Sequence, residues 1–210
     1  MRESWDRAAP WTGVLFVILV LAGGVSVGGA PGSGASAAQV LAYYRDHRMQ
    51  ERVGAALLTF AFVAFLAFSV VVSRHLHRYA QDGLATFAMA GATLLAGGQM
   101  LSASVHWALA DRPAALAPAG LQALNVAAND FVLVSAGGWF AFSVAVWLAI
   151  LRSRALPVWL GWISLAVALL VVSPAELIGF VIFLVWTLIT SGLLWARWPA
   201  HDTERVGVTV

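Results

Sequence analysis

The chain has 210 residues, of which 61% are hydrophobic and 10% are charged, and its mean hydropathy is +0.84. Soluble domains carry about 45–50% apolar and about 25% charged residues, so soluble, disordered and fibrous proteins are excluded and a polytopic membrane protein remains. The chain contains no cysteine. It also contains no lysine, since all 12 basic residues are arginine. This excludes disulfides, thiol nucleophiles, iron–sulfur ligation, lysine Schiff bases and a P-loop lysine.

The formal net charge is only +2 at pH 7, and the arginines lie scattered at the ends of apolar runs. This pattern indicates that the arginines orient the helices in a membrane rather than bind nucleic acid. Abundant Ala, Gly, Val and Arg without Lys indicate a GC-rich bacterial genome. The sequence has no zinc-helix spacing, nucleophile elbow, nucleotide loop or pair of mid-membrane histidines for haem, so we expect no cofactor.

Six uncharged stretches are predicted to cross the membrane as helices, because about 20 helical residues span the hydrocarbon core. Strands are disfavoured, since the runs are long and show no alternation of polar and apolar residues. The predicted fold is all-α: one membrane domain, residues 1–210, with a bundle of six transmembrane helices and a flexible cytoplasmic tail at residues 197–210. The predicted spans are residues 11–29, 53–73, 83–106, 131–151, 157–173 and 176–196.

The first apolar run has two interpretations. A charged start, an apolar run and the small residues Gly28, Gly29 and Ala30 are typical of a cleaved signal peptide. The run is longer than the usual core of a signal peptide, and Glu3 and Asp6 lie in its charged start. These two features favour an uncleaved span.

An outer amphipathic helix is predicted between the first and second spans. Ser36 and Gln39 have the spacing of a capping box, in which the two side chains cover orphan backbone N–H groups. The helix, residues 36–52, lies along the membrane surface or continues into the second span with a bend near Gly54. Its common face carries Val40, Leu41, Tyr44 and His47. Glu51 follows one turn after His47, so the two can pair.

Polar side chains form two stripes at the outer ends of the third and fourth spans. Polar groups inside a bilayer are costly, which makes them default candidates for a functional site. The first stripe comprises Gln99, Ser102 and His106, and the second comprises Gln122, Asn125 and Asn129, followed by Asp130. Facing each other, the stripes would form an outward-facing polar pocket with His106 near Asp130. The alternative is that they only hydrogen-bond neighbouring helices together.

Any metal site would have to be assembled from separate helices. The weak candidates for its ligands are His106, Asp130 and Glu176. Ser173, Pro174 and Glu176 also fit a helix start, with Ser at the N-cap, Pro at N1 and Glu at N3. Capping explains Glu176 without a ligand, so we assign no metal.

The arginines predict that both termini face the cytoplasm. In a six-span chain eight arginines fall on the inner side and four on the outer side, as the positive-inside rule requires. The inner set is Arg2, Arg7, Arg74, Arg78, Arg152, Arg154, Arg197 and Arg205, and the outer set is Arg45, Arg48, Arg52 and Arg112. The expected location is the bacterial cytoplasmic membrane.

Small residues at helical spacing predict close helix packing and would also allow an oligomer. The pattern occurs at Gly24 and Gly28 in the first span and at Ala88, Ala92 and Ala96 in the third. Glycine pairs at 97–98 and 137–138 are the plausible weak points for the broken helices of a transporter.

Two segments carry a resemblance. One runs from Arg154 to Trp162, RALPVWLGW, and opens a span after a basic inner loop; the other runs from Tyr43 to Arg48, YYRDHR, before the second span. With the span layout, they resemble small bacterial integral membrane proteins grouped as domains of unknown function. The resemblance covers most of the chain and implies a polytopic membrane protein. It transfers no activity and no functional residue.

Three functions remain open. The first is a non-enzymatic membrane protein that binds a lipid, a small molecule or a partner protein through the outer polar pocket, and the lack of a catalytic motif favours it. The second is a small transporter or permease subunit, which needs polar groups or broken helices near the bilayer midplane. The third is a metal-dependent membrane hydrolase that uses His106 and Asp130 with Glu176 or His47, which must then lie within a few ångströms of each other.

Overall fold

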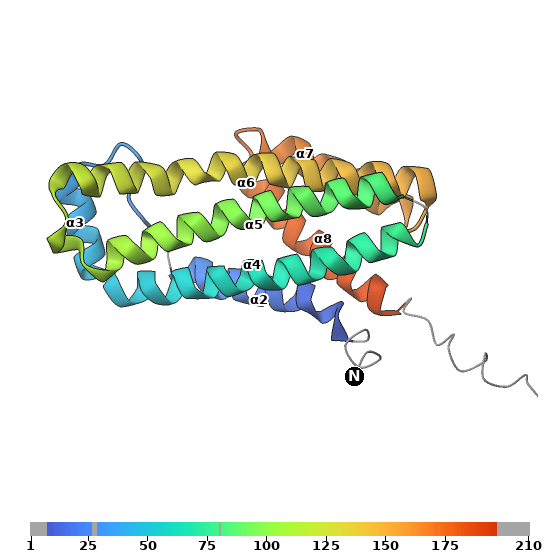
Figure 1. Cartoon of the computed structure of the whole chain (residues 1–210), viewed down its shortest axis with the longest axis horizontal. Helices are drawn as coiled ribbons and strands as arrows, with labels where there is room; N and C mark the ends of the chain where they lie inside the picture. The colour runs from blue at the N-terminus through green and yellow to red at the C-terminus, as the bar shows by residue number, and fades with distance from the viewer. Residues whose placement is uncertain (1–7, 27–28, 80, 197–210) are drawn as a thin grey trace, which may run out of the picture.

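The computed structural model of the chain describes residues 8–26, 29–79 and 81–196 (Figure 1). Within these residues the regular structure consists of helices without any strand, which confirms the predicted all-α fold. The elements in chain order are α2 (Trp11–Ser26), α3 (Ala37–Asp46), α4 (Arg48–His77), α5 (Asp82–Asp111), the 3-10 turn η1 (Pro113–Ala115), α6 (Pro118–Ser153), α7 (Val158–Val171) and α8 (Glu176–Ala196).

Four of the described helices are long and apolar enough to cross a membrane. They are α4, α5, α6 and α8, with 30, 30, 36 and 21 residues. The helices α2 and α7 have only 16 and 14 residues, fewer than the roughly 20 that span the hydrocarbon core. Helices suited to a membrane are therefore confirmed, and the predicted number of six spans is not.

The described helices other than α3 form a closed ring in chain order. Contacts join α2 to α4, α4 to α5, α5 to α6, α6 to α7, α7 to α8, and α8 back to α2. In Figure 1 the long helices α4, α5 and α6 run lengthwise through the bundle, and α3 lies across one end. We call this end, where α4 begins and α5 ends, the α3 end. The opposite end, which we call the turn end, carries the α4–α5 and α6–α7 connections.

Aromatic side chains from α2, α4, α6 and α8 meet in the middle of the ring. We call the set Phe16, Phe65, Phe142, Phe183 and Trp186 the aromatic layer. The ring centroid of Phe65 lies 5.2 Å from that of Phe16 and 5.5 Å from that of Phe142. Phe183 lies 5.7 Å from Phe65 and stacks on Trp186 at 6.0 Å. Because lipid is as apolar as these side chains, dispersion and ring geometry hold the layer together.

Glycines allow α5 and α6 to approach each other closely. A Cβ atom at Gly138 would lie 2.2 Å from the backbone nitrogen of Leu95, and one at Gly98 would also clash with α6. A Cβ at Gly97 or Gly137 would meet nothing within 4 Å. Both helices run unbroken through these positions. The interpretation of the glycine pairs as helix breaks is therefore wrong, because Gly98 and Gly138 are packing positions inside continuous helices.

The corner between the outer helix and the next span lies at His47. α3 ends at Asp46 and α4 begins at Arg48, so the outer helix is shorter than the predicted residues 36–52. The bend predicted near Gly54 is wrong, because that glycine is buried inside α4. The first turn of α4 thus belongs to the long helix, and α3 turns away from it across the end of the bundle.

The segment before the predicted fourth span is continuous with that span. α6 runs for 36 residues, so its boundaries extend well beyond the predicted 131–151. On α5, the small side chains Ala88, Ala92 and Ala96 are at most 1% exposed, which leaves this face unavailable to an oligomer because the chain's own helices cover it. Gly28 and the predicted tail at residues 197–210 lie outside the described residues.

Candidate functional site

α3 is fixed both at its start and along its buried face. The predicted capping box is confirmed: Ser36 Oγ accepts from the Gln39 backbone N–H at 3.4 Å, and Gln39 Oε1 accepts from the Ser36 backbone N–H at 2.8 Å. Val40 and Tyr44, on the predicted face, are 0% exposed. They belong to a small apolar cluster with Leu109, Ala110 and Leu121. α3 therefore closes over the ends of α5 and α6.

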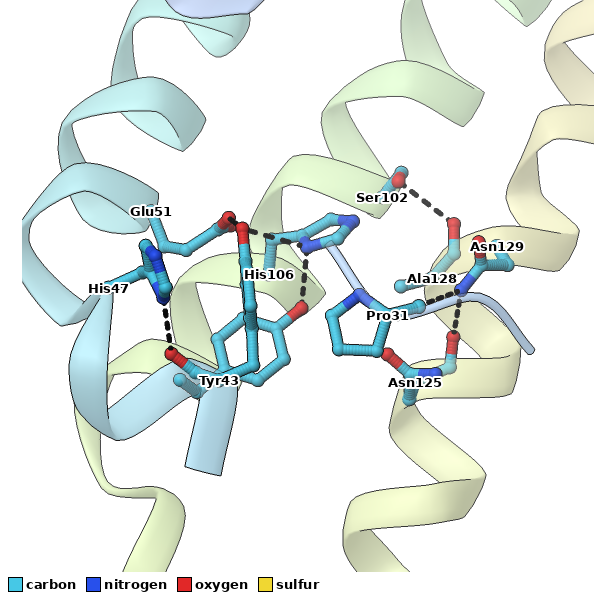
Figure 2. A network of polar contacts seen from close by, with 10 residues as sticks. Pro31, Tyr43, His47, Glu51, Ser102, His106, Asn125, Ala128 and Asn129 are labelled. Carbon is cyan, nitrogen blue, oxygen red and sulfur yellow. Dashed lines mark hydrogen bonds and ion pairs between the residues drawn. The ribbon is translucent and has the colours of Figure 1, made fainter. Parts of the chain in front are cut away.

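Two tyrosines of α3 reach a buried carboxyl group and a histidine (Figure 2). Tyr43 donates its hydroxyl hydrogen bond to Glu51 Oε1 of α4 at 2.6 Å. The Tyr44 hydroxyl lies 2.7 Å from Nδ1 of His106 on α5. The same Nδ1 lies 3.5 Å from Glu51 Oε2, and the Glu51 side chain is 0% exposed. We call Tyr43, Tyr44, Glu51 and His106 the Glu51 cluster.

The carboxyl group of Glu51 and the imidazole of His106 lie side by side without a direct hydrogen bond. Glu51 Oε2 is buried without a hydrogen-bond partner, and the His106 Nδ1 atom 3.5 Å away is bonded by Tyr44. A buried carboxylate without a counter-charge costs several kcal/mol. The described hydrogen bond that compensates this burial comes from the Tyr43 hydroxyl on Glu51 Oε1.

The two tyrosines of the cluster are held neutral. Desolvation by burial is the main cause that raises the pKa of Tyr43 and of Tyr44 above the ordinary tyrosine value, because burial disfavours the phenolate. The nearby Glu51 carboxylate raises the pKa of both hydroxyls further. Both hydroxyls consequently stay protonated across the physiological pH range. Tyr43 donates to Glu51, whereas the direction of the Tyr44 bond depends on the tautomer of His106.

His47 lies beside the Glu51 cluster. Its ring stacks on the Tyr43 ring with 4.5 Å between centroids, and its Nδ1 lies 3.1 Å from the Tyr43 carbonyl oxygen. The side-chain pairing of His47 with Glu51 expected from their spacing is wrong, because Glu51 turns into the bundle and bonds Tyr43.

Ion pairs surround Asp111 on the exposed rim of the α3 end. Arg48 and Arg52 of α4 approach its Oδ1 at 3.7 and 3.6 Å. Arg112 approaches its Oδ2 at 3.6 Å. The Arg52 guanidinium also lies 4.7 Å from the ring centroid of Trp107. Exposed pairs of this kind contribute about 0–1 kcal/mol each, so the rim adds little to the stability of this end.

The predicted polar stripes divide between several roles. Ser102 Oγ of α5 donates to the carbonyl oxygen of Ala128 on α6 at 2.9 Å, which joins the two helices. His106 belongs to the Glu51 cluster. Gln122 and Asp130 are exposed, and no described ion pair joins His106 to Asp130.

The asparagines of the second stripe hold the chain that follows α2. Asn125 Nδ2 donates to the carbonyl oxygen of Gly32 at 3.0 Å. Asn129 Nδ2 donates to the carbonyl oxygens of Asn125 at 2.8 Å and Pro31 at 3.4 Å (Figure 2). These contacts match the alternative in which the stripes hydrogen-bond neighbouring segments.

The weak metal candidates are not brought together. No group of three or more His, Asp and Glu side chains that could hold a metal ion occurs in the described part of the chain. Asp130 and Glu176 are exposed, on α6 and α8. Glu176 is the first residue of α8, and Ser173 Oγ accepts from the Ala175 backbone N–H at 3.2 Å. The predicted N3 position of Glu176 is wrong, because the helix starts later than expected.

A cavity of about 90 Å³ lies at the centre of the ring, on the α3 side of the aromatic layer. Five helices line it, through Phe16, Val20, Leu58, Phe62, Leu95, Gln99, Trp139, Phe180 and Phe183. Gln99 brings the one side-chain amide into this lining and is half-buried. The indole nitrogen of Trp139 is buried without a hydrogen-bond partner. Of the predicted pocket residues, Gln99 therefore lines a cavity that is mostly apolar.

The cavity and the Glu51 cluster lie on the same faces of α4 and α5. Leu58 follows Glu51 by seven residues, and Gln99 precedes His106 by seven residues. Seven residues make two helical turns, or about 10 Å along the axis. The Glu51 cluster is therefore two turns from the cavity, toward the α3 end.

The sequence pattern does not reveal Glu51 as a neighbour of His106 or Tyr43 as the partner of Glu51, because the charged run at residues 45–52 fits a solvated helix face. One signal was available. Glu51 precedes Gly54 and Leu58 at i+3 and i+7, which puts an acid on the apolar face of the second span. An acid on such a face is a default candidate for a functional group.

Comparison of the chain with protein-family models, curated protein sequences and solved structures finds no match. The resemblance to small bacterial membrane proteins of unknown function stays a prediction. The function is therefore argued from the geometry of the chain's own residues.

Proposed function

We propose that the protein is a non-enzymatic integral membrane protein that holds an apolar molecule in the cavity at the centre of its helix ring. The cavity carries this proposal, because its walls are aromatic and aliphatic around the single amide of Gln99. Binding sites for small molecules are typically apolar concavities with a few polar groups that orient the ligand.

The size of the cavity limits the ligand. Its volume is about 90 Å³, and engineered apolar cavities of roughly 150 Å³ bind benzene. We therefore expect an alkyl or isoprenoid chain segment, or one small ring, rather than a bulky molecule. The Gln99 amide can donate to or accept from a polar group on that ligand, and the Trp139 N–H is a second donor in the wall.

We place the ring in the bacterial cytoplasmic membrane with six helices in the bilayer and both termini in the cytoplasm. Although α2 and α7 are short, each packs between two neighbours of the ring. Their outward side chains are apolar, with Ile18 58% exposed on α2 and Leu169 57% exposed on α7. In the six-span assignment eight arginines of the sequence fall on the side of the turn end and four on the side of the α3 end, which favours a cytoplasmic position of the turn end under the positive-inside rule. The four of them that lie at the turn end within the described residues are Arg74, Arg78, Arg152 and Arg154.

Transport and metal-dependent hydrolysis have no comparable support. α4, α5 and α6 are continuous helices, whereas transporter sites typically use broken helices. The described residues contain no cluster of three or more metal-ligating side chains. Ligand binding in the cavity is therefore the function that the geometry supports best.

Photo-crosslinking in bilayers tests this proposal. The probe is a diazirine-bearing fatty alcohol, and mass spectrometry maps the labelled peptides. We expect labelling of the segments that contain Leu58 and Gln99. Val20→Phe fills the cavity and is expected to reduce this labelling roughly fivefold or more. The matched control is Val25→Phe on the same helix, because Val25 is 86% exposed.

The control should label like the parent protein. Labelling spread evenly over the lipid-facing surface would contradict the proposal. So would unchanged labelling in a Val20→Phe variant that keeps the parent's thermal unfolding temperature.

A further inference from the structure

We infer that the Glu51 cluster is a proton-binding site that controls whether α3 lies closed over its end of the bundle. This control acts on α3 itself and does not require a ligand in the cavity. Its failure and the failure of ligand binding can therefore be told apart.

The side-chain hydrogen bonds that join α3 to α4 and α5 end on the two titratable groups of the cluster. Tyr43 bonds Glu51 at 2.6 Å, and Tyr44 bonds His106 at 2.7 Å. The rest of the interface is the small apolar cluster around Val40, which does not respond to pH. A change in the charge of Glu51 or His106 therefore alters the hydrogen bonds that hold α3 in place.

Acid protonates the Glu51 carboxyl group and the His106 imidazole. A neutral carboxylic acid is a weaker acceptor than a carboxylate, so the bond from Tyr43 to Glu51 loses its charge assistance. The His106 imidazolium then has no counter-charge, although its side chain is only 16% exposed. Burying an unpaired charge is costly, so protonation favours a state in which α3 moves away and water reaches His106.

The other charged and titratable groups nearby do not replace this pair. They are His47 between α3 and α4, Arg48 and Arg52 on α4, and Asp111 and Arg112 where α5 ends. His47 contacts Tyr43 on its own segment. The arginines approach Asp111 on the exposed rim, where solvent screens their charges. On α6, Asp130 directly follows Asn129 and is exposed.

Opening of α3 would expose the end of the bundle that lies two helical turns from the cavity. The face of α3 that carries Val40 is 0% exposed in the closed form. Reactivity at this position therefore reports the open form directly.

Thiol labelling measures this reactivity, because the chain has no cysteine of its own. Val40→Cys places a thiol under α3, and Ala42→Cys places one on its exposed face. The reagent is 4,4′-dithiodipyridine, applied in bilayer nanodiscs at about pH 7.5 and about pH 4.5, which bracket much of the ordinary titration range of His and Glu. The ratio of the two labelling rates cancels the effect of pH on the reagent.

We expect this ratio to rise about tenfold or more at the lower pH, in line with the loss of a hydrogen-bonded charge pair. The double substitution Glu51→Gln and His106→Gln keeps side chains of similar size and removes both titrating groups. It should make the ratio independent of pH. His77→Gln removes a histidine at the turn end and should leave the response intact. If the double variant does not fold, His106→Gln alone removes the imidazolium and should flatten the response.

Ser73→Cys at the turn end separates local opening from unfolding. Ser73 is 8% exposed and should stay protected at the lower pH. The inference is overturned if the ratio does not change with pH, if the variant without both titrating groups responds like its parent, or if Ser73→Cys becomes reactive together with Val40→Cys.

Discussion

The α3 end and the aromatic layer share helices α4 and α6 and are held together by different forces. At the α3 end, Tyr43 and Tyr44 donate to or share hydrogen bonds with Glu51 and His106, which lie on two other helices. In the aromatic layer, rings such as Phe65 and Phe183 pack at 5.7 Å between centroids, and no member of the layer titrates. The first region depends on charge and hydrogen bonding, and the second depends on volume.

This difference explains which region can respond to a signal. Dispersion contacts change little with pH, so the aromatic layer is a fixed support for the cavity. A buried acid–base pair changes its charge with one proton, and its hydrogen bonds change with it. Function that needs movement is therefore expected at the α3 end, and function that needs a constant shape is expected at the ring centre.

The largest effect is expected for Glu51→Ala. The substitution leaves the Tyr43 hydroxyl without its hydrogen-bond partner and the His106 ring without the neighbouring carboxyl group. Loss of one member of a buried pair costs about 3 kcal/mol. The free energy of unfolding in mixed detergent micelles measures this loss. The control is Glu176→Ala, an exposed acid on α8, with an expected change within about 0.5 kcal/mol. Equal losses in the two variants would show that the buried contacts of Glu51 contribute nothing to the free energy of unfolding.

A smaller effect is expected for Gly138→Ala in the ring. The added Cβ would lie 2.2 Å from the backbone nitrogen of Leu95, so α5 and α6 must separate, at a cost of about 2 kcal/mol. Gly137→Ala is the matched control on the same helix, because its Cβ meets nothing within 4 Å. The control should gain up to about 1 kcal/mol from helix propensity. If Gly138→Ala is as stable as Gly137→Ala, the close approach of α5 and α6 is not essential.

The smallest effect is an alkaline loss of stability that comes from Tyr43 and Tyr44. Burial raises the pKa of both hydroxyls in the folded state, so the unfolded chain ionises first, near the ordinary value of about 10. The stabilisation is therefore complete below about pH 10 and is lost as pH rises from there toward the folded pKa. Unfolding measured from about pH 8 to 11 should show this decline. The decline should flatten in Tyr43→Phe and Tyr44→Phe, and a decline of the same slope in both variants would contradict its origin in these tyrosines.

Local signals determined much of the architecture. The apolar runs predict membrane helices, and α8 has the predicted bounds of residues 176–196. The capping box of Ser36 and Gln39 also formed as predicted. A helix start and an apolar run depend on residues within a few turns of each other, so their spacing along the chain is sufficient.

The sequence by itself therefore determined that this chain forms apolar helices suited to a membrane, with a short capped helix, α3, between the first two. Only the tertiary structure decided which polar groups form a site. Tyr44 and His106 meet across 62 residues of chain, and Asn125 meets Gly32 across 93. Helical spacing shows that a side chain lies on a given face, but the partner on that face is set by how α3 turns at His47 and how the ring closes. For that reason Glu51, placed by its spacing beside His47, bonds Tyr43 and lies beside His106 in the interior instead.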